Sequence, residues 1–154
     1  MKKIALYTAI ITSFVFGSCS SDDATDTQKP TIILVEPGDH EGFLPGSELH
    51  IEGILSDNDG LASYKIEIHG ASDGHNHARA VNNYFQYEQS FTLADQPKVY
   101  EMKHEIQIPL LQNDAPLTPG HYHVGIFALD KSGNQEQLFV EIYIGDDANE
   151  HHHD

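Results

Sequence analysis

The sequence has one cysteine, Cys19, and no tryptophan, and its 8 lysines and arginines are outnumbered by 24 aspartates and glutamates. A single cysteine excludes an intramolecular disulfide and any metal site built from several thiolates. The formal charge of −16 makes nucleic acid an unfavourable partner and concentrates cations around the protein. The folded part must therefore be held together by its hydrophobic core, for which a chain of this length is sufficient.

The sequence also lacks the common catalytic signatures. It contains no Gly-x-Ser-x-Gly, no phosphate-binding glycine loop and no His-Glu-x-x-His. A histidine-only zinc site with an open position could activate water, but no general base stands out near the histidines described below. We therefore expect that the protein is not an enzyme.

The first residues predict export. The start MKK is basic, an apolar run extends from Ile4 to Gly17, and a small residue precedes Cys19. The run is too short for a stable transmembrane anchor and is typical of a signal peptide over residues 1–18. Its removal leaves 6 basic residues against 24 acidic ones, a formal charge of −18. The polar stretch over residues 19–29 is expected to form a flexible tether.

The lone cysteine resembles the lipobox cysteine of bacterial lipoproteins, although Phe16 departs from the leucine usual three positions before it. The resemblance implies that the Cys19 thiol is acylated and anchors the mature chain to a membrane. The following SSDDATDTQKP resembles the export signal of Bacteroidetes surface lipoproteins. It implies display on the outer face of the outer membrane, whereas an ordinary secretory signal with a chance cysteine is the alternative.

Residues 30–145 predict an all-β domain, because short alternating runs are separated by Gly, Pro, Asn and Asp. We expect seven strands: Thr31–Val35, Ser47–Leu55, Ser63–His69, Tyr84–Leu93, Val99–Ile108, His121–Asp130 and Gln135–Ile144. Seven strands at this spacing predict an immunoglobulin-like β-sandwich of two antiparallel sheets. Residues 146–154 are expected to form an acidic, histidine-rich tail.

Three segments resemble a family of Bacteroidetes surface lipoproteins with an immunoglobulin-like domain of unknown function: SDNDGLASYKIEIHGASDGHNHA, YEMKHEIQIP and PGHYHVGIFALDKSGNQ. The family pattern is a Ser-Tyr-x-Ile-x-Ile-His strand, an Asp followed by His-x-His in the next loop, and a late Gly-x-Tyr-His. The resemblance implies site residues at His69, Asp73, His75, His77 and His123. It implies fold and location more than activity.

Ten of the 11 histidines are predicted to gather at one end of the sandwich. Alternate strands of an antiparallel sandwich run in opposite directions, so strand 63–69 ends where strand 121–130 begins. Strand 31–35 begins at the opposite end, beside the tether, so the histidine end would point away from the membrane. The histidines expected at this end are His40, His50, His69, His75, His77, His121, His123 and the tail residues His151, His152 and His153.

Side-chain alternation predicts which of these histidines face outward. Ile66 and Val124 belong to the inward sets of their strands, which turns His69, His121 and His123 to the outside. Imidazole nitrogens with a carboxylate oxygen suit zinc, and next copper(II) or nickel. The predicted metal ligands are His69, Asp73, His75, His77, His123 and His121. A solvated polar loop that binds metal weakly is the alternative.

Several other polar residues are not assigned to the predicted zinc or copper site. His104 alternates with inward residues and is expected to be a hydrogen-bonded core histidine. The trio His151–His153 is expected to be a weakly chelating tail. Asp57, Asp59 and Asp130, in two turns at the tether end, form a possible calcium site, although both stretches are also ordinary turn sequences.

These observations predict a surface-exposed outer-membrane lipoprotein that binds zinc, or copper, at its membrane-distal end. Its expected partners are the membrane, through the lipid on Cys19, the metal ion, and an outer-membrane uptake receptor. The alternative is an adhesive module that binds glycan or protein and has no specific metal site.

Overall fold

The computed structural model describes residues 25–71 and 83–146. The predicted signal peptide, Cys19, the loop with Asp73, His75 and His77, and the tail histidines lie outside these residues. No helix long and apolar enough to cross a membrane occurs in the described part of the chain.

The described residues form ten β-strands: β1 (Thr31–Glu36), β2 (Glu41–Phe43), β3 (Glu48–Ser56), β4 (Leu61–Gly70), β5 (Tyr87–Thr92), β6 (Val99–Gln107), β7 (Leu111–Gln112), β8 (Ala115–Pro116), β9 (Gly120–Asp130) and β10 (Gln135–Ile144). Each of the seven predicted strands is present, β10 with the predicted bounds and the other six with bounds shifted by up to three residues. The prediction omitted β2, β7 and β8. These strands have two or three residues, too few to show an alternating pattern, and only their pairing with other segments identifies them.

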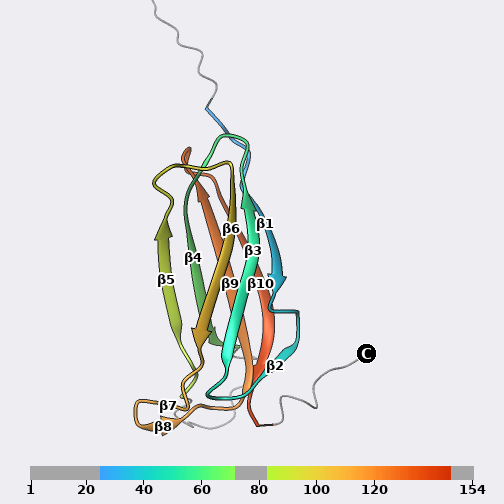
Figure 1. Cartoon of the computed structure of the whole chain (residues 1–154), viewed down its shortest axis with the longest axis vertical. Coiled ribbons are helices and arrows are strands. Elements are labelled where there is room, and N and C mark those ends of the chain that lie inside the picture. The colour runs from blue at the N-terminus through green and yellow to red at the C-terminus, as the bar shows by residue number, and fades with distance from the viewer. Residues whose placement is uncertain (1–24, 72–82, 147–154) are drawn as a thin grey trace, which may run out of the picture.

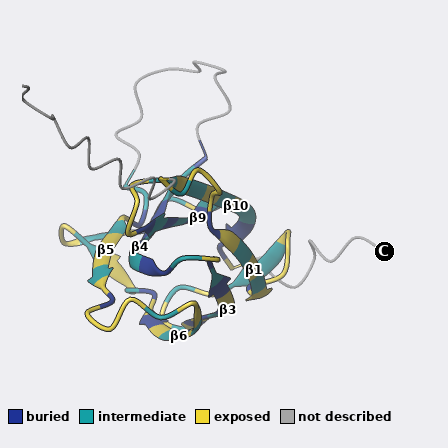
Figure 2. Ribbon diagram, turned by 90° about the horizontal axis from the view of Figure 1, so that it is seen from above, coloured by how far each residue is buried: buried dark blue, intermediate teal, exposed yellow. Residues whose placement is uncertain are grey.

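The long strands build two facing sheets. One sheet has the order β1-β3-β6 and the other β2-β10-β9-β4-β5, while β7 and β8 pair only with each other. The pairs are antiparallel except for β2 with β10. Figures 1 and 2 show the two layers, with buried residues between them. The chain is therefore an immunoglobulin-like β-sandwich, as its sequence predicts.

Alternating apolar residues form the core between the layers. In β3 the inward residues Leu49, Ile51 and Leu55 are fully buried, and Ile66 of β4 and Ile126 of β9 meet them from the other sheet. The polar residues between them face solvent because successive side chains of a strand point to opposite faces. This rule leaves every second residue of β4, β9 and β10 available for a site on the outer surface.

A buried tyrosine holds the start of β9. The Tyr122 hydroxyl donates a hydrogen bond to the Thr118 carbonyl at 2.7 Å and accepts one from the Phe85 N–H at 3.3 Å. Burial raises the pKa of Tyr122, so the phenol remains neutral and able to donate. This arrangement is the tyrosine corner common in immunoglobulin-like folds. It positions the segment that carries His121 and His123.

His104 is half-buried between the sheets, and the predicted hydrogen bond of its ring is present. Its Nε2 is 2.8 Å from the Tyr64 hydroxyl, and its ring lies 4.5 Å from that of Phe91. Burial lowers the pKa of His104 and raises that of Tyr64. Both side chains are therefore uncharged at neutral pH.

The lowered pKa of His104 predicts a pH-dependent stability. The unfolded chain binds a proton at His104 more readily than the folded chain does, so acid favours unfolding. The free energy of unfolding should therefore fall as the pH decreases through about 6.5, the ordinary histidine pKa, until the folded-state pKa is passed. In thermal unfolding between pH 8 and 5, His104→Gln should show a smaller slope than the wild type. Equal slopes would contradict this assignment.

Candidate functional site

The register between β4 and β9 places His69 directly opposite His123. Their rings lie 5.5 Å apart, centroid to centroid, and are almost perpendicular. Both side chains point away from the core because Ile68 and Val124 take the inward positions beside them. The predicted juxtaposition of these two imidazoles is confirmed, whereas their role as metal ligands stays a prediction.

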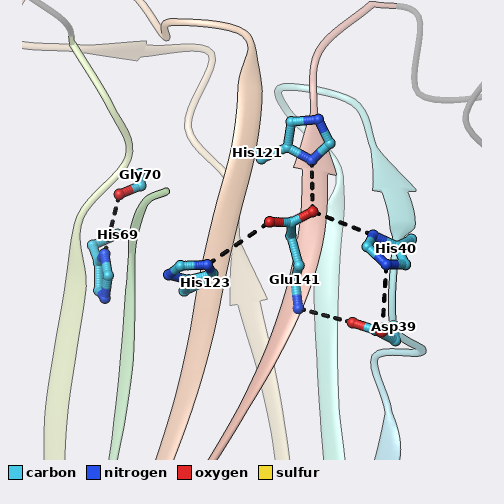
Figure 3. A network of polar contacts seen from close by, with 7 residues as sticks. All are labelled: Asp39, His40, His69, Gly70, His121, His123 and Glu141. Carbon is cyan, nitrogen blue, oxygen red and sulfur yellow. Dashed lines mark hydrogen bonds and ion pairs between the residues drawn. The ribbon is translucent and has the colours of Figure 1, made fainter. Parts of the chain in front are cut away.

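A carboxylate from β10 lies beside them. Glu141 pairs with His123 in the β9–β10 register. Its Oε1 is 2.9 Å from His121 Nδ1 and 3.3 Å from His40 Nδ1, and its Oε2 is 3.8 Å from His123 Nε2 (Figure 3). Sequence reasoning missed Glu141, although the short turn between β9 and β10 would have placed it opposite His123.

The connection between β1 and β2 brings His40 to this surface. The His40 N–H donates a hydrogen bond to the Glu141 carbonyl at 2.6 Å, and the Glu141 N–H donates one to Asp39 Oδ1 at 3.1 Å. His40 adopts a φ of 61°, in the left-handed region that non-glycine residues seldom occupy. The connection is thereby joined to β10 at the residue that contacts the other histidines. We call His40, His69, His121, His123 and Glu141 the histidine pole.

Acceptor oxygens lie beside ring nitrogens of two imidazoles. Nδ1 of His69 is 3.1 Å from the Gly70 carbonyl, which can only accept, and Nε2 of the same ring is 3.7 Å from Glu67 Oε1. Nδ1 of His121 lies 2.9 Å from Glu141 Oε1. A carboxylate or carbonyl that holds one ring nitrogen while the other binds metal is the usual arrangement of histidine ligands.

The histidine pole is accessible to an ion from solvent. The side chains of His69, His121 and His123 are 44%, 46% and 41% exposed. Within the described residues, no three of its potential ligand atoms all lie within 4.8 Å of one another. An ion would therefore have to draw these side chains together, or take further ligands from a neighbouring segment.

The residues on either side of such a segment lie at the same end of the sandwich as the pole. Asp73, His75 and His77 fall in residues 72–82, outside the described residues. On one side of this segment, the Ala71 N–H donates a hydrogen bond to the His121 carbonyl at 2.8 Å. On the other side, the Asn83 N–H donates to Thr118 Oγ1 at 2.7 Å, just before β9. Both flanks are thus fixed at the end of the sandwich that carries the histidine pole.

His50 lies at the predicted end of the sandwich but belongs to the other sheet. It lies on the outer face of β3, in the other sheet, with Glu36 and Glu52. One potential ligand atom of each of these three residues lies within 4.8 Å of the others, but the group is exposed and Glu52 is paired with Lys103. The direction of a strand predicts the end of the sandwich at which a residue lies, but it does not predict the sheet to which the strand belongs. Because β3 belongs to the other sheet, His50 is separate from the histidine pole.

The predicted calcium trio changes in one member. Asp57 and Asp130 do come together, and the third carboxylate is that of Asp26. Asp59 instead pairs with Lys131, with Oδ1 and Nζ 3.0 Å apart. Asp26 belongs to residues 19–29, which were predicted to be a tether, so the sequence offered no reason to place it there.

Comparison with known proteins identifies the family and the fold. The family model of a domain of unknown function, DUF4625, matches residues 17–145. No curated protein is significantly similar to the sequence. Among solved structures, catalytically inactive OgpA from Akkermansia muciniphila, in complex with an O-glycopeptide, is 16% identical with a TM-score of 0.50, over 82% of this chain and 32% of OgpA.

The fibronectin(III)-like modules of CbhA from Clostridium thermocellum are 14% identical with a TM-score of 0.44, over 75% of this chain and 96% of theirs. The sporulation control protein Spo0M from Bacillus subtilis is 19% identical with a TM-score of 0.43, over 76% of this chain and 49% of Spo0M. The chain spans about a third of the length of the OgpA chains that it matches. At these identities the likeness concerns the fold alone.

Proposed function

We propose that this chain, which belongs to the DUF4625 family of domains of unknown function, binds a divalent transition metal, zinc or copper(II), at the histidine pole. The observation that carries the proposal is the pairing of His69 with His123 beside the Glu141 carboxylate. Three imidazoles and a carboxylate on adjacent strands provide the nitrogen and oxygen donors that zinc and copper(II) prefer.

In such a site Glu141 could bind the ion directly or could orient the imidazoles that bind it, and the geometry favours the orienting role. Glu141 Oε1 lies 2.9 Å from His121 Nδ1 and 3.3 Å from His40 Nδ1. A carboxylate so placed orients the imidazoles, as the carboxylate partners of zinc-bound histidines do. The ion would then be held by imidazole nitrogens of β4 and β9, with His75, His77 and Asp73 of the following segment completing the ligand set.

The proposed location is the outer-membrane surface, through a lipid on Cys19. Residues 25–30 enter the sandwich at the end opposite the histidine pole (Figure 1), so a membrane anchor before them would leave the pole facing outward. The acidic surface would raise the local concentration of cations. A metal bound at such a position is available to an outer-membrane uptake receptor, the partner that we propose.

The test is calorimetric titration of zinc and of copper(II) into the mature chain, residues 19–154. We expect one saturable site with micromolar or tighter affinity, and the same site when His151, His152 and His153 are all replaced by alanine. Calcium should not compete, because it prefers oxygen ligands. Weak, non-saturating binding, or a site that disappears with the tail histidines, would refute the proposal.

A second candidate function uses the same outer face. Phe139 of β10 is 44% exposed and meets the Phe127 ring edge-on, with centroids 5.5 Å apart, and Lys65 Nζ lies 4.3 Å from the centre of the Phe127 ring. Exposed aromatic rings beside a cation suit stacking against a glycan or a protein partner. For this adhesive module, binding would be independent of metal and would be weakened by Phe139→Ala.

A further inference from the structure

Three carboxylates from distant parts of the sequence meet at the end of the sandwich opposite the histidine pole. Asp26 precedes β1, Asp57 follows β3, and Asp130 ends β9. One oxygen of each carboxylate lies within 4.8 Å of an oxygen of each of the others. Asp57 and Asp130 are 7% and 1% exposed. We call these three residues the aspartate cluster.

Local turns account for half of the oxygens in the cluster. In each aspartate, Oδ1 accepts hydrogen bonds from backbone N–H groups that follow it: that of Gln28 for Asp26, those of Asp59 and Gly60 for Asp57, and those of Ser132 and Asn134 for Asp130. Such bonds are common where aspartate begins a turn, and they do not require a ligand.

Two of the three remaining oxygens are not explained by the turns. Oδ2 of Asp57 and Oδ2 of Asp26 are both buried, and neither has a hydrogen-bond partner among the residues that the structure describes. The whole Asp57 residue is 93% removed from solvent, given its exposure of 7%. A buried carboxylate oxygen without a donor or a cation is strongly unfavourable, and native proteins rarely leave one so.

Protein cations do not compensate this charge. Lys131 Nζ is 3.0 Å from Asp59 and Lys29 Nζ is 3.6 Å from Glu136, so these two lysines pair with other acids. No ion pair to the cluster occurs within residues 25–71 and 83–146. Burial tends to raise the pKa of Asp130, but hydrogen bonds from Asn134, Ser132 and Gly133 outweigh it and hold that pKa below its ordinary value. The carboxylates therefore face one another without a compensating positive charge.

We propose that the aspartate cluster binds a calcium ion, which fastens the segment before β1 to the sandwich. Calcium takes six to eight oxygen ligands, with carboxylates foremost, and zinc or copper would prefer nitrogen. With bonds of 2.3–2.6 Å, two oxygens on one calcium ion lie at most about 5 Å apart, and the spacing within the cluster meets this limit. Water and backbone carbonyls supply the remaining ligands.

The position of Asp26 indicates what the ion does. The Asn134 side chain already joins the segment to the sandwich, because its Nδ2 donates to the Asp26 carbonyl at 3.0 Å and to Asp130 Oδ2 at 2.7 Å. Calcium links Asp26 to Asp57, in the turn after β3, and to Asp130, at the end of β9. The ion thereby fastens the segment that carries Asp26 to the sandwich. Its value for a membrane anchor rests on the proposed lipidation of Cys19, and the site itself is independent of the histidine pole.

The test is thermal unfolding of the mature chain with millimolar calcium or with a chelator, in about 0.15 M NaCl so that general charge screening is constant. At a calcium concentration 100 times the dissociation constant, Tm should rise by about 5–10 °C. Magnesium at the same concentration should give a clearly smaller rise, because it demands a tighter octahedral shell and loses water reluctantly.

Three aspartate variants test whether the calcium-dependent rise in Tm comes from binding at the aspartate cluster. Asp57→Asn keeps the oxygen that accepts from Asp59 and Gly60, so it should fold, but it should lose the calcium-dependent rise in Tm. Asp26→Asn, in the segment before β1, should lose it as well. Asp59→Asn is the matched control and should retain the full rise. An unchanged wild-type Tm, a rise that survives Asp57→Asn or Asp26→Asn, or an equal rise with magnesium would overturn the proposal.

Discussion

Replacing both His69 and His123 by alanine should lower the affinity of the mature chain for zinc by more than about 100-fold. The two imidazoles face each other across β4 and β9, and both are proposed to bind the ion directly. Removing even an indirect partner of a metal ligand typically costs 10-fold to 100-fold in affinity, so the loss of two direct ligands should exceed that range. Calorimetric or competitive titration with zinc measures the change.

The matched control is His50→Ala. This histidine is also exposed on an outer face, and it has two glutamates beside it, but it belongs to the other sheet. It should leave zinc affinity unchanged. If His50→Ala removes the site and the His69→Ala, His123→Ala variant retains it, the metal binds at Glu36, His50 and Glu52 instead. All variants should unfold at a Tm close to that of the wild type, because the replaced side chains are outside the core.

Glu141→Gln refines the same test. The amide has nearly the shape of the carboxylate but lacks its charge, so the ion pair with His121 is lost. If Glu141 orients the imidazoles, zinc affinity should fall by about 10-fold to 100-fold while one site per chain remains. Unchanged affinity would exclude Glu141 from the site.

Tyr122→Phe should destabilise the domain by about 2 kcal/mol. The change removes the hydroxyl that donates to the Thr118 carbonyl and accepts from the Phe85 N–H, and it leaves both backbone groups without that partner. A buried polar group that loses its partner costs about 1–3 kcal/mol, and Thr118 can regain part of this from water. Thermal unfolding should show a decrease in Tm of about 8 °C for a domain of this size.

Tyr87→Phe is the control for this change. The Tyr87 hydroxyl donates to Gln89 Oε1 at 2.6 Å on the exposed side of β5, so its loss should change the free energy of unfolding by less than about 0.5 kcal/mol. If both variants lose equal stability, the tyrosine corner does not have the role assigned to it.

The sequence by itself determined the strands and the direction of their side chains. Alternation is a local property with a period of two residues, so it places Ile66 inside and His69 outside without knowledge of the fold. Since antiparallel strands reverse direction at each connection, it also determined that His69 and His123 lie at the same end. The pairing of these two residues followed once β4 and β9 were taken as neighbours, as in other immunoglobulin-like folds.

Only the tertiary structure showed which residues of the connections, which have no alternating pattern, lie at the histidine pole and in the aspartate cluster. His40 and Asp26 lie in connections, and their positions depend on hydrogen bonds to Glu141 and to Asn134, far away in the sequence. His50 shares an end with the histidine pole, but it lies on the other sheet, which its alternation could not reveal. Alternation and direction are encoded along one strand, whereas sheet membership and the docking of a connection arise from contacts between distant segments. For that reason the long strands and the histidine pair were predictable, whereas the position of Asp26 beside Asp57 and Asp130 was not.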